Sequence, residues 1–152
     1  MIQACGWCNG SVVRCISSLP GFDHAACFGK KGTGFHETIL RWVTNFRSDE
    51  DQCYDVLLAC LDVLSEAVEK GALSKESMFQ EYYGWDYNGQ VPLFWLTENE
   101  NRKATQLLLN QREFSILEQV RRIRDPVKGT VNTYEGNGGR WLLVNNISEG
   151  RA

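Results

Sequence analysis

The apolar pattern between Ser48 and Gly71 constrains the fold of this chain more than any other feature of its sequence. Apolar side chains recur there at three- and four-residue steps, as they do on the buried face of an α-helix: Val56, Leu57, Cys60, Leu61, Leu64, Ala67 and Val68. Ser48 suits an N-cap, the acidic residues 49–51 suit the first turn, and Gly71 suits the C′ position. We therefore predict a largely buried helix over residues 49–70, with Leu57, Leu61 and Leu64 in the core.

Further helices are predicted on both sides of this segment. Phe35, Ile39, Trp42 and Phe46 give residues 35–47 an amphipathic helical period. A shorter helix is predicted from Lys75 to Tyr83, capped by Ser74 and ended near Gly84. The sequence Thr97-Glu-Asn-Glu100 matches a capping box, which predicts a last helix running to about residue 125, with a kink near Asn110. The predicted helical core covers residues 35–128.

We expect β structure at both ends of this helical core. Residues 11–16 fit a short strand, and two β-prone runs at 130–134 and 140–144 flank a glycine-rich loop. The second pair predicts a hairpin within residues 129–146. The predicted fold class is therefore α+β, predominantly helical, as a single domain over 1–152: a Cys/Gly-rich segment at 1–34, four or so helices, and a C-terminal β-hairpin.

Composition narrows the classes of function. A net charge of −3 argues against broad nucleic-acid binding, which needs a basic surface. No apolar run approaches the roughly 20 residues that a membrane-spanning helix needs. The N-terminus shows neither a basic leader nor an apolar core of a signal peptide. We therefore expect a soluble cytoplasmic protein, in which the cysteines are free thiols or metal ligands rather than disulfides.

The front of the chain concentrates the reactive chemistry. Of six cysteines and two histidines, four cysteines and one histidine lie within the first 27 residues. The pairs Cys5-x-x-Cys8 and His24-x-x-Cys27 each offer two ligands, and three thiolates with one imidazole satisfy tetrahedral zinc. We therefore predict a zinc site at Cys5, Cys8, His24 and Cys27, with Cys15 as a possible replacement for His24.

The same residues allow a different chemistry. A cysteine nucleophile, drawn from Cys5, Cys8, Cys15 or Cys27, would need His24 or His36 within hydrogen-bond reach as its base. A third, smaller feature is the glycine- and lysine-rich segment 29–34, which is a candidate anion-binding loop but does not have the P-loop order.

No catalytic constellation or nucleotide-binding fingerprint is recognisable in the chain. We therefore predict a small protein-interaction module, of the inhibitor, immunity or accessory type, that binds another protein. The alternative hypothesis is a small thiol-dependent enzyme with its cysteine nucleophile and histidine base in the N-terminal segment.

Overall fold

A computed structural model describes residues 9–29, 38–45, 49–84, 90–112 and 114 of the chain. These residues contain seven helices and no strand: α2 (Gly10–Ser17), α3 (His24–Cys27), α4 (Ile39–Asn45), α5 (Glu50–Glu69), α6 (Lys75–Tyr83), α7 (Pro92–Glu98) and α8 (Arg102–Leu109). The predicted α+β class is therefore wrong for the described part of the chain, which is helical. The predicted hairpin at 129–146 lies outside the described residues.

Helix α2 corrects the strand predicted at residues 11–16. Its first turn is capped by the side chain of Asn9, which accepts a hydrogen bond from the Val12 N–H at 3.1 Å. Val13 is fully buried, and Ile16, one turn later, packs against the core. The two β-branched valines favour a strand locally, but the cap and the three-residue spacing of buried side chains favour a helix.

Helix α5 confirms the helix predicted over residues 49–70, but its N-cap is Asp49 and not Ser48 as predicted. It starts at Glu50 because Asp49 is the N-cap, with its carboxylate accepting from the Asp51 N–H at 2.7 Å. It ends before Gly71, whose φ of +71° is the left-handed conformation that glycine tolerates best. Three core leucines are at most 1% exposed, as predicted, and two cysteines of the same helix are buried with them: Leu57, Leu61, Leu64, Cys53 and Cys60.

The neighbouring helices α4 and α6 also follow the sequence. Helix α6 has the predicted bounds, with the Ser74 hydroxyl accepting from the Ser77 N–H at 3.1 Å and Gly84 as its C-cap. Helix α4 occupies residues 39–45 of the predicted 35–47, and the flanking residues lie outside the described ones.

The region after residue 90 differs from the prediction, because two short helices replace the start of one long one. Pro92 begins α7 at a position where its missing N–H costs nothing. The predicted capping box is wrong: Thr97 lies in the last turn of α7, and its hydroxyl donates to the Phe94 carbonyl at 2.8 Å. Asn101 caps α8 instead, and Asn110 ends that helix rather than kinking it. Glu100, at φ +55°, reverses the chain between them.

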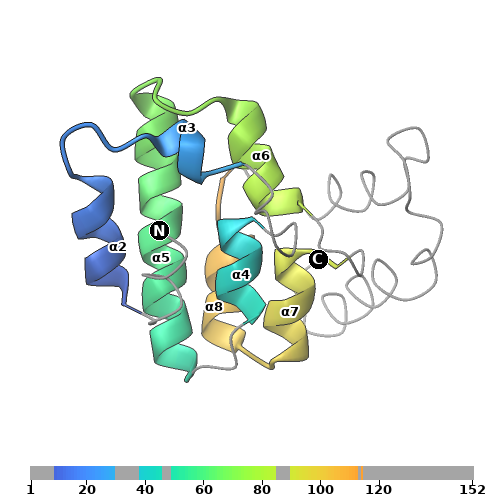
Figure 1. The fold of residues 1–152 in the computed structure, drawn as a ribbon. Coiled ribbons are helices and arrows are strands. Elements are labelled where there is room, and N and C mark those ends of the chain that lie inside the picture. Colours follow the sequence, from blue (N-terminus) through green and yellow to red (C-terminus); the bar gives the residue numbers. More distant parts are fainter. Residues whose placement is uncertain (1–8, 30–37, 46–48, 85–89, 113, 115–152) are drawn as a thin grey trace, which may run out of the picture.

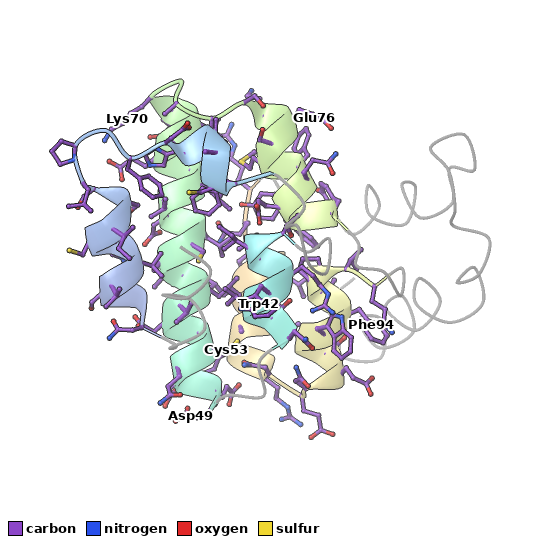
Figure 2. All side chains as sticks on the ribbon, in the orientation of Figure 1. Trp42, Asp49, Cys53, Lys70, Glu76 and Phe94 are labelled. Atoms are coloured by element: carbon purple, nitrogen blue, oxygen red, sulfur yellow. The ribbon has the colours of Figure 1, made fainter. Side chains whose placement is uncertain are left out.

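The helices are arranged around α5, whose ends are marked by Asp49 and Lys70 (Figure 2). Helix α2 lies beside α5 on one side, and α4 and α8 lie on the other, with α7 beyond them (Figure 1). Helix α3 lies near the C-terminal end of α5. Within the described part of the chain, no helix combines the length and apolarity needed to cross a membrane.

Candidate functional site

A cleft of about 670 Å³ opens between α2, α3 and the C-terminal half of α5. Its lining combines residues from the front segment and from the buried helix: Arg14, Cys15, Ser17, Ser18, His24, Asp62, Val63, Glu66, Ala67, Lys70 and Ala72. The cleft therefore brings together one cysteine and one histidine that sequence reasoning had treated as reactive.

The cleft has an apolar base and a charged rim. Val63 and Ala67 are 5% and 2% exposed, so they form an apolar base supplied by α5. On the rim, the Arg14 guanidinium lies 3.2 Å from the Asp62 carboxylate, across the gap between α2 and α5. An apolar base with a polar rim is typical of sites that accept an apolar group and orient it by hydrogen bonds.

A second ion pair completes the rim at the end of α5. The Lys70 ammonium donates to the Glu66 carboxylate, and this bond and charge hold the pKa of Glu66 below its usual value. His24 lines the same cleft as Glu66, and its charge adds a smaller lowering of the Glu66 pKa. The His24 ring also packs edge-on against Phe22, with centroids 4.8 Å apart.

Polar contacts fix α2 on α5. The Gly10 N–H donates to the Asp55 carboxylate at 2.9 Å, and the Arg14 guanidinium approaches the same carboxylate at 3.9 Å. A Cβ at position 10 would lie 2.6 Å from the Asp55 Oδ2 and 2.7 Å from its carbonyl oxygen. Glycine is therefore required at this position for α2 to approach α5 so closely.

An apolar strip lies on another side of this region, formed by Val12 and Ile16 on α2 and by Leu19, two residues after the helix ends at Ser17. Val12 and Leu19 are 39% and 55% exposed, and they are the two exposed large apolar side chains among the described residues. Ile16 lies between them and is partly buried against the core. The helical spacing separates this strip from Arg14 and Ser17, which face the cleft.

The predicted zinc ligands are only partly placed. His24 and Cys27 both lie on α3, one turn apart, with His24 lining the cleft and Cys27 packed partly against the core. Cys5 and Cys8 lie outside the described residues. Among the residues that the structure describes, no three His, Cys, Asp or Glu side chains are grouped closely enough to hold a metal ion. The zinc site stays a prediction.

The candidate nucleophiles and bases are also only partly among the described residues, which include Cys15, Cys27 and His24. Cys15 is exposed and lines the cleft that His24 also lines. Sequence reasoning named both residues but had no means of choosing this pair, because α5, some 40 residues further along the chain, supplies the rest of the cleft.

A second polar centre, which sequence reasoning missed, is the Glu81 carboxylate. It is fully buried, and its two oxygens accept hydrogen bonds from the Gly29 N–H at 2.7 Å and the Leu40 N–H at 2.8 Å. Burial raises the pKa of Glu81 to about 7, and hydrogen bonds from the backbone and from Thr38 limit the rise. The sequence held one indication that Glu81 is buried: it lies three residues after Met78, on the apolar face of α6.

Gly29 begins the segment that we considered as an anion-binding loop. Its φ is +71°, and its N–H donates to the Glu81 carboxyl group at 2.7 Å, so this donor is already used by a side chain of the protein. Residues 30–34 lie outside the described part of the chain, and the anion site is not tested there.

Comparison with known proteins gives no relative: no protein family matches the chain, and no curated protein or solved structure is significantly similar to it. A function is therefore inferred from the cleft and the α2 surface alone.

Proposed function

We propose that this protein is an interaction module, of the inhibitor, immunity or accessory type, that binds another protein through α2. The observation that carries the proposal is the apolar strip: both exposed large apolar side chains of the described residues belong to this part of the chain, Val12 to α2 and Leu19 to the turn directly after it. Val12 and Ile16 lie four residues apart, the spacing at which a helix presents apolar side chains to a groove of a partner protein, and Leu19 extends the same apolar surface beyond the helix.

The free energy available from the apolar strip is too small for stable binding, so we propose that the cleft also contacts the partner. Full burial of a Val or Leu side chain contributes about 1.5–3 kcal/mol, and Val12 and Leu19 are already partly buried. Association costs about 4–15 kcal/mol in lost translational and rotational freedom, so two or three such side chains do not suffice. The Arg14–Asp62 pair beside the cleft offers polar groups that would orient a partner segment.

The proposal is tested by cross-linking followed by a binding measurement. A photoreactive residue at position 19 should capture a partner that the same residue at position 76, exposed on α6, does not. With the purified partner, the double substitution V12S/L19S should weaken binding at least tenfold, as measured by calorimetry, and E76Q should leave it unchanged. Undiminished binding by V12S/L19S, with an unchanged melting temperature, would exclude α2 as the contact.

The alternative, a thiol-dependent enzyme, is favoured by one observation: Cys15 and His24 line the same cleft. A thiol activated by an imidazole is alkylated rapidly at a pH well below the ordinary cysteine pKa of about 8.5. In an enzyme, iodoacetamide should react with Cys15 fastest of all the thiols, and H24Q should abolish this preference. In an interaction module, C15S should leave partner binding intact, and Cys15 should react as an ordinary exposed thiol.

Zinc at Cys5, Cys8, His24 and Cys27 also remains a proposal, in which the metal would order residues 1–34. It is supported by α3, which carries His24 and Cys27 three residues apart on one short helix. We expect one zinc ion per chain in freshly purified protein and none in the C27S variant. Metal-free protein with unchanged hydrogen exchange in α2 and α3 would contradict the proposal. A cytoplasmic location is also a proposal: in a reducing compartment the cysteines would be available as metal ligands rather than paired in disulfides.

A further inference from the structure

Three segments meet at the Glu81 side chain. Glu81 belongs to α6, Gly29 ends the turn after α3, and Leu40 lies in the first turn of α4. The contact with Gly29 is close, because a Cβ at that position would lie 2.5 Å from the Ser77 Cβ on α6. The carboxylate thus joins the end of α3 and the start of α4 to one side of α6, a place that we call the α6 junction.

We propose that the α6 junction is a proton-linked latch: protonated Glu81 keeps the Gly29 turn and the start of α4 closed on α6, and loss of the proton favours opening. The proposal concerns a conformational device in the fold and is independent of the proposed function. Its geometric basis is a fully buried carboxyl group whose hydrogen bonds run to two segments that follow one another in the chain.

The direction follows from the cost of burying a charge. An ionised carboxylate in this closed site has lost its hydration, and the hydrogen bonds from the Gly29 and Leu40 amides offset the loss only partly. The pKa of Glu81 is therefore raised to about 7 in the closed state, from 4.5 for a solvated glutamate. Opening returns the carboxylate to water, so the opening equilibrium grows as the pH rises.

The size of the effect follows from the same two values. If the open state has the solvated pKa, the opening constant increases about 70-fold between pH 5 and pH 8, and it levels off above pH 7. Because the pKa of Glu81 is about 7 in the closed state, the latch would respond to pH changes near neutrality, the range over which cellular compartments differ.

Other ionisable groups lie on the elements that pack against Glu81. On α4, the Arg41 guanidinium is directed at α7, with its carbon 4.5 Å from the centroid of the Trp95 ring. On α6, Glu76 is exposed and accepts from the Gln80 amide. Further ionisable groups on these elements are His24 and Cys27 on α3, of which His24 faces the cleft, Tyr82 and Tyr83 on α6, and Lys75, Glu66, Glu69 and Lys70 at the adjoining ends of α5 and α6. Burial and hydrogen bonds, rather than any of these charges, account for the pKa of Glu81.

Four further ionisable residues lie in the segment between Gly29 and Thr38, outside the described residues: Lys30, Lys31, His36 and Glu37. His36 is the one whose ordinary pKa, about 6.5, falls in the same range as that of Glu81. The test must therefore separate the two residues.

The first measurement uses the unmodified chain. With ¹³C-labelled glutamate, the Cδ resonance of one residue should titrate with a midpoint near 7, well apart from the ordinary glutamates. Over the same range, hydrogen exchange of the Gly29 and Leu40 amides should lose about 70-fold in protection between pH 5 and pH 8, while the Leu61 amide of α5 keeps its protection. A glutamate spectrum in which every midpoint lies below 5.5 would overturn the proposal.

Three variants assign the effect. In E81Q the loss of protection at Gly29 and Leu40 between pH 5 and pH 8 should disappear, whereas H36Q and the surface control E76Q should retain it. A pH dependence that persists in E81Q, or that vanishes in H36Q, would overturn the proposal. E81Q places an amide group against two backbone donors. If this variant fails to fold, the glutamate titration of the unmodified chain decides the outcome.

Discussion

The centre of the molecule and its front segment are held by different kinds of contact. Helix α5 buries nine residues, all apolar or cysteine, against the surrounding helices. Helix α2 buries only Gly10 and Val13, and it is fixed to α5 by the Asp55 and Asp62 carboxylates. The end of α3 is fixed in a similar way, by Glu81. Apolar packing supplies most of the stability here, while the polar contacts mainly determine where the front segment lies.

The largest effect should come from the apolar centre. Leu61→Ala should lower the free energy of unfolding by about 2–5 kcal/mol, because the side chain is 1% exposed and its removal leaves a cavity. Val12→Ala, at 39% exposed on α2, should cost less than about 1 kcal/mol. Urea denaturation of both variants gives the comparison. Equal losses would mean that the two regions do not differ in the way described.

The next effect concerns the polar attachment at Glu81. Because the pKa of Glu81 is raised to about 7 in the folded state, its contribution to stability is present below pH 4.5 and is lost as the pH rises to 7. The unfolding free energy should be about 2–3 kcal/mol smaller at pH 8 than at pH 5, relative to E81Q measured at the same two values. A difference of the opposite sign would mean that the native structure favours the ionised carboxylate.

A smaller effect is expected where α2 touches α5. Gly10→Ala should cost about 1–3 kcal/mol, because the new Cβ would meet the Asp55 side chain and its carbonyl oxygen. Hydrogen exchange should show protection lost at Val13 and retained at Leu61, since α2 would move away while α5 stays folded. Ser11→Ala, on the exposed side of α2, is the matched control. Loss of protection throughout α5 would show that α2 is part of the same cooperative unit.

The smallest effect belongs to the ion pair on the rim of the cleft. Arg14→Gln should cost less than about 1 kcal/mol, because the Arg14 and Asp62 side chains are 41% and 57% exposed and water screens their attraction. Thermal unfolding at low and high salt checks the claim: added salt should narrow the gap between the variant and the unmodified chain. A loss of more than about 2 kcal/mol in the free energy of unfolding would mean that Arg14 contributes substantially to the stability of the fold.

The same division decides what the sequence could predict. Helices α5 and α6 were predictable because the signals for each helix are local. The apolar period lies in the helix, and the capping residues and terminal glycines lie at its ends. Helix α2 was missed because Val12 and Val13 favour a strand locally. Part of what holds this helix in place is the contact of Gly10 with Asp55, 45 residues away, and no local pattern reveals such a contact.

The helices after residue 90 show a second limit. Residues 97–100 match a capping box, but the helix that begins at Pro92 extends to Glu98 and therefore includes Thr97. The helix that follows takes its cap from Asn101, whose side chain accepts from the Ala104 N–H at 3.1 Å. Two adjacent cap sequences compete, and the position of the preceding helix decides between them.

The candidate sites depended on tertiary structure even more strongly. Sequence reasoning named Cys15 and His24, but the cleft that they share exists only because α5 supplies its base. Glu81 was not singled out from the sequence, although its spacing from the buried Met78 places it on the same face of α6. A charged residue on an apolar face is a signal that sequence analysis can use, whereas its two amide donors are visible only in the structure.

The central position of α5 also has a consequence for the order of folding. Helices α2, α4, α6 and α8 all contact α5, and the contacts with α2 and α8 join segments that are distant in the chain. A folding transition state that contains α5 with α4 and α6 needs only short loops, so we expect α2 and α8 to dock after the rate-limiting step. Substitutions in α5, such as Leu61→Ala, should then slow folding, whereas Gly10→Ala should leave the folding rate unchanged and accelerate unfolding.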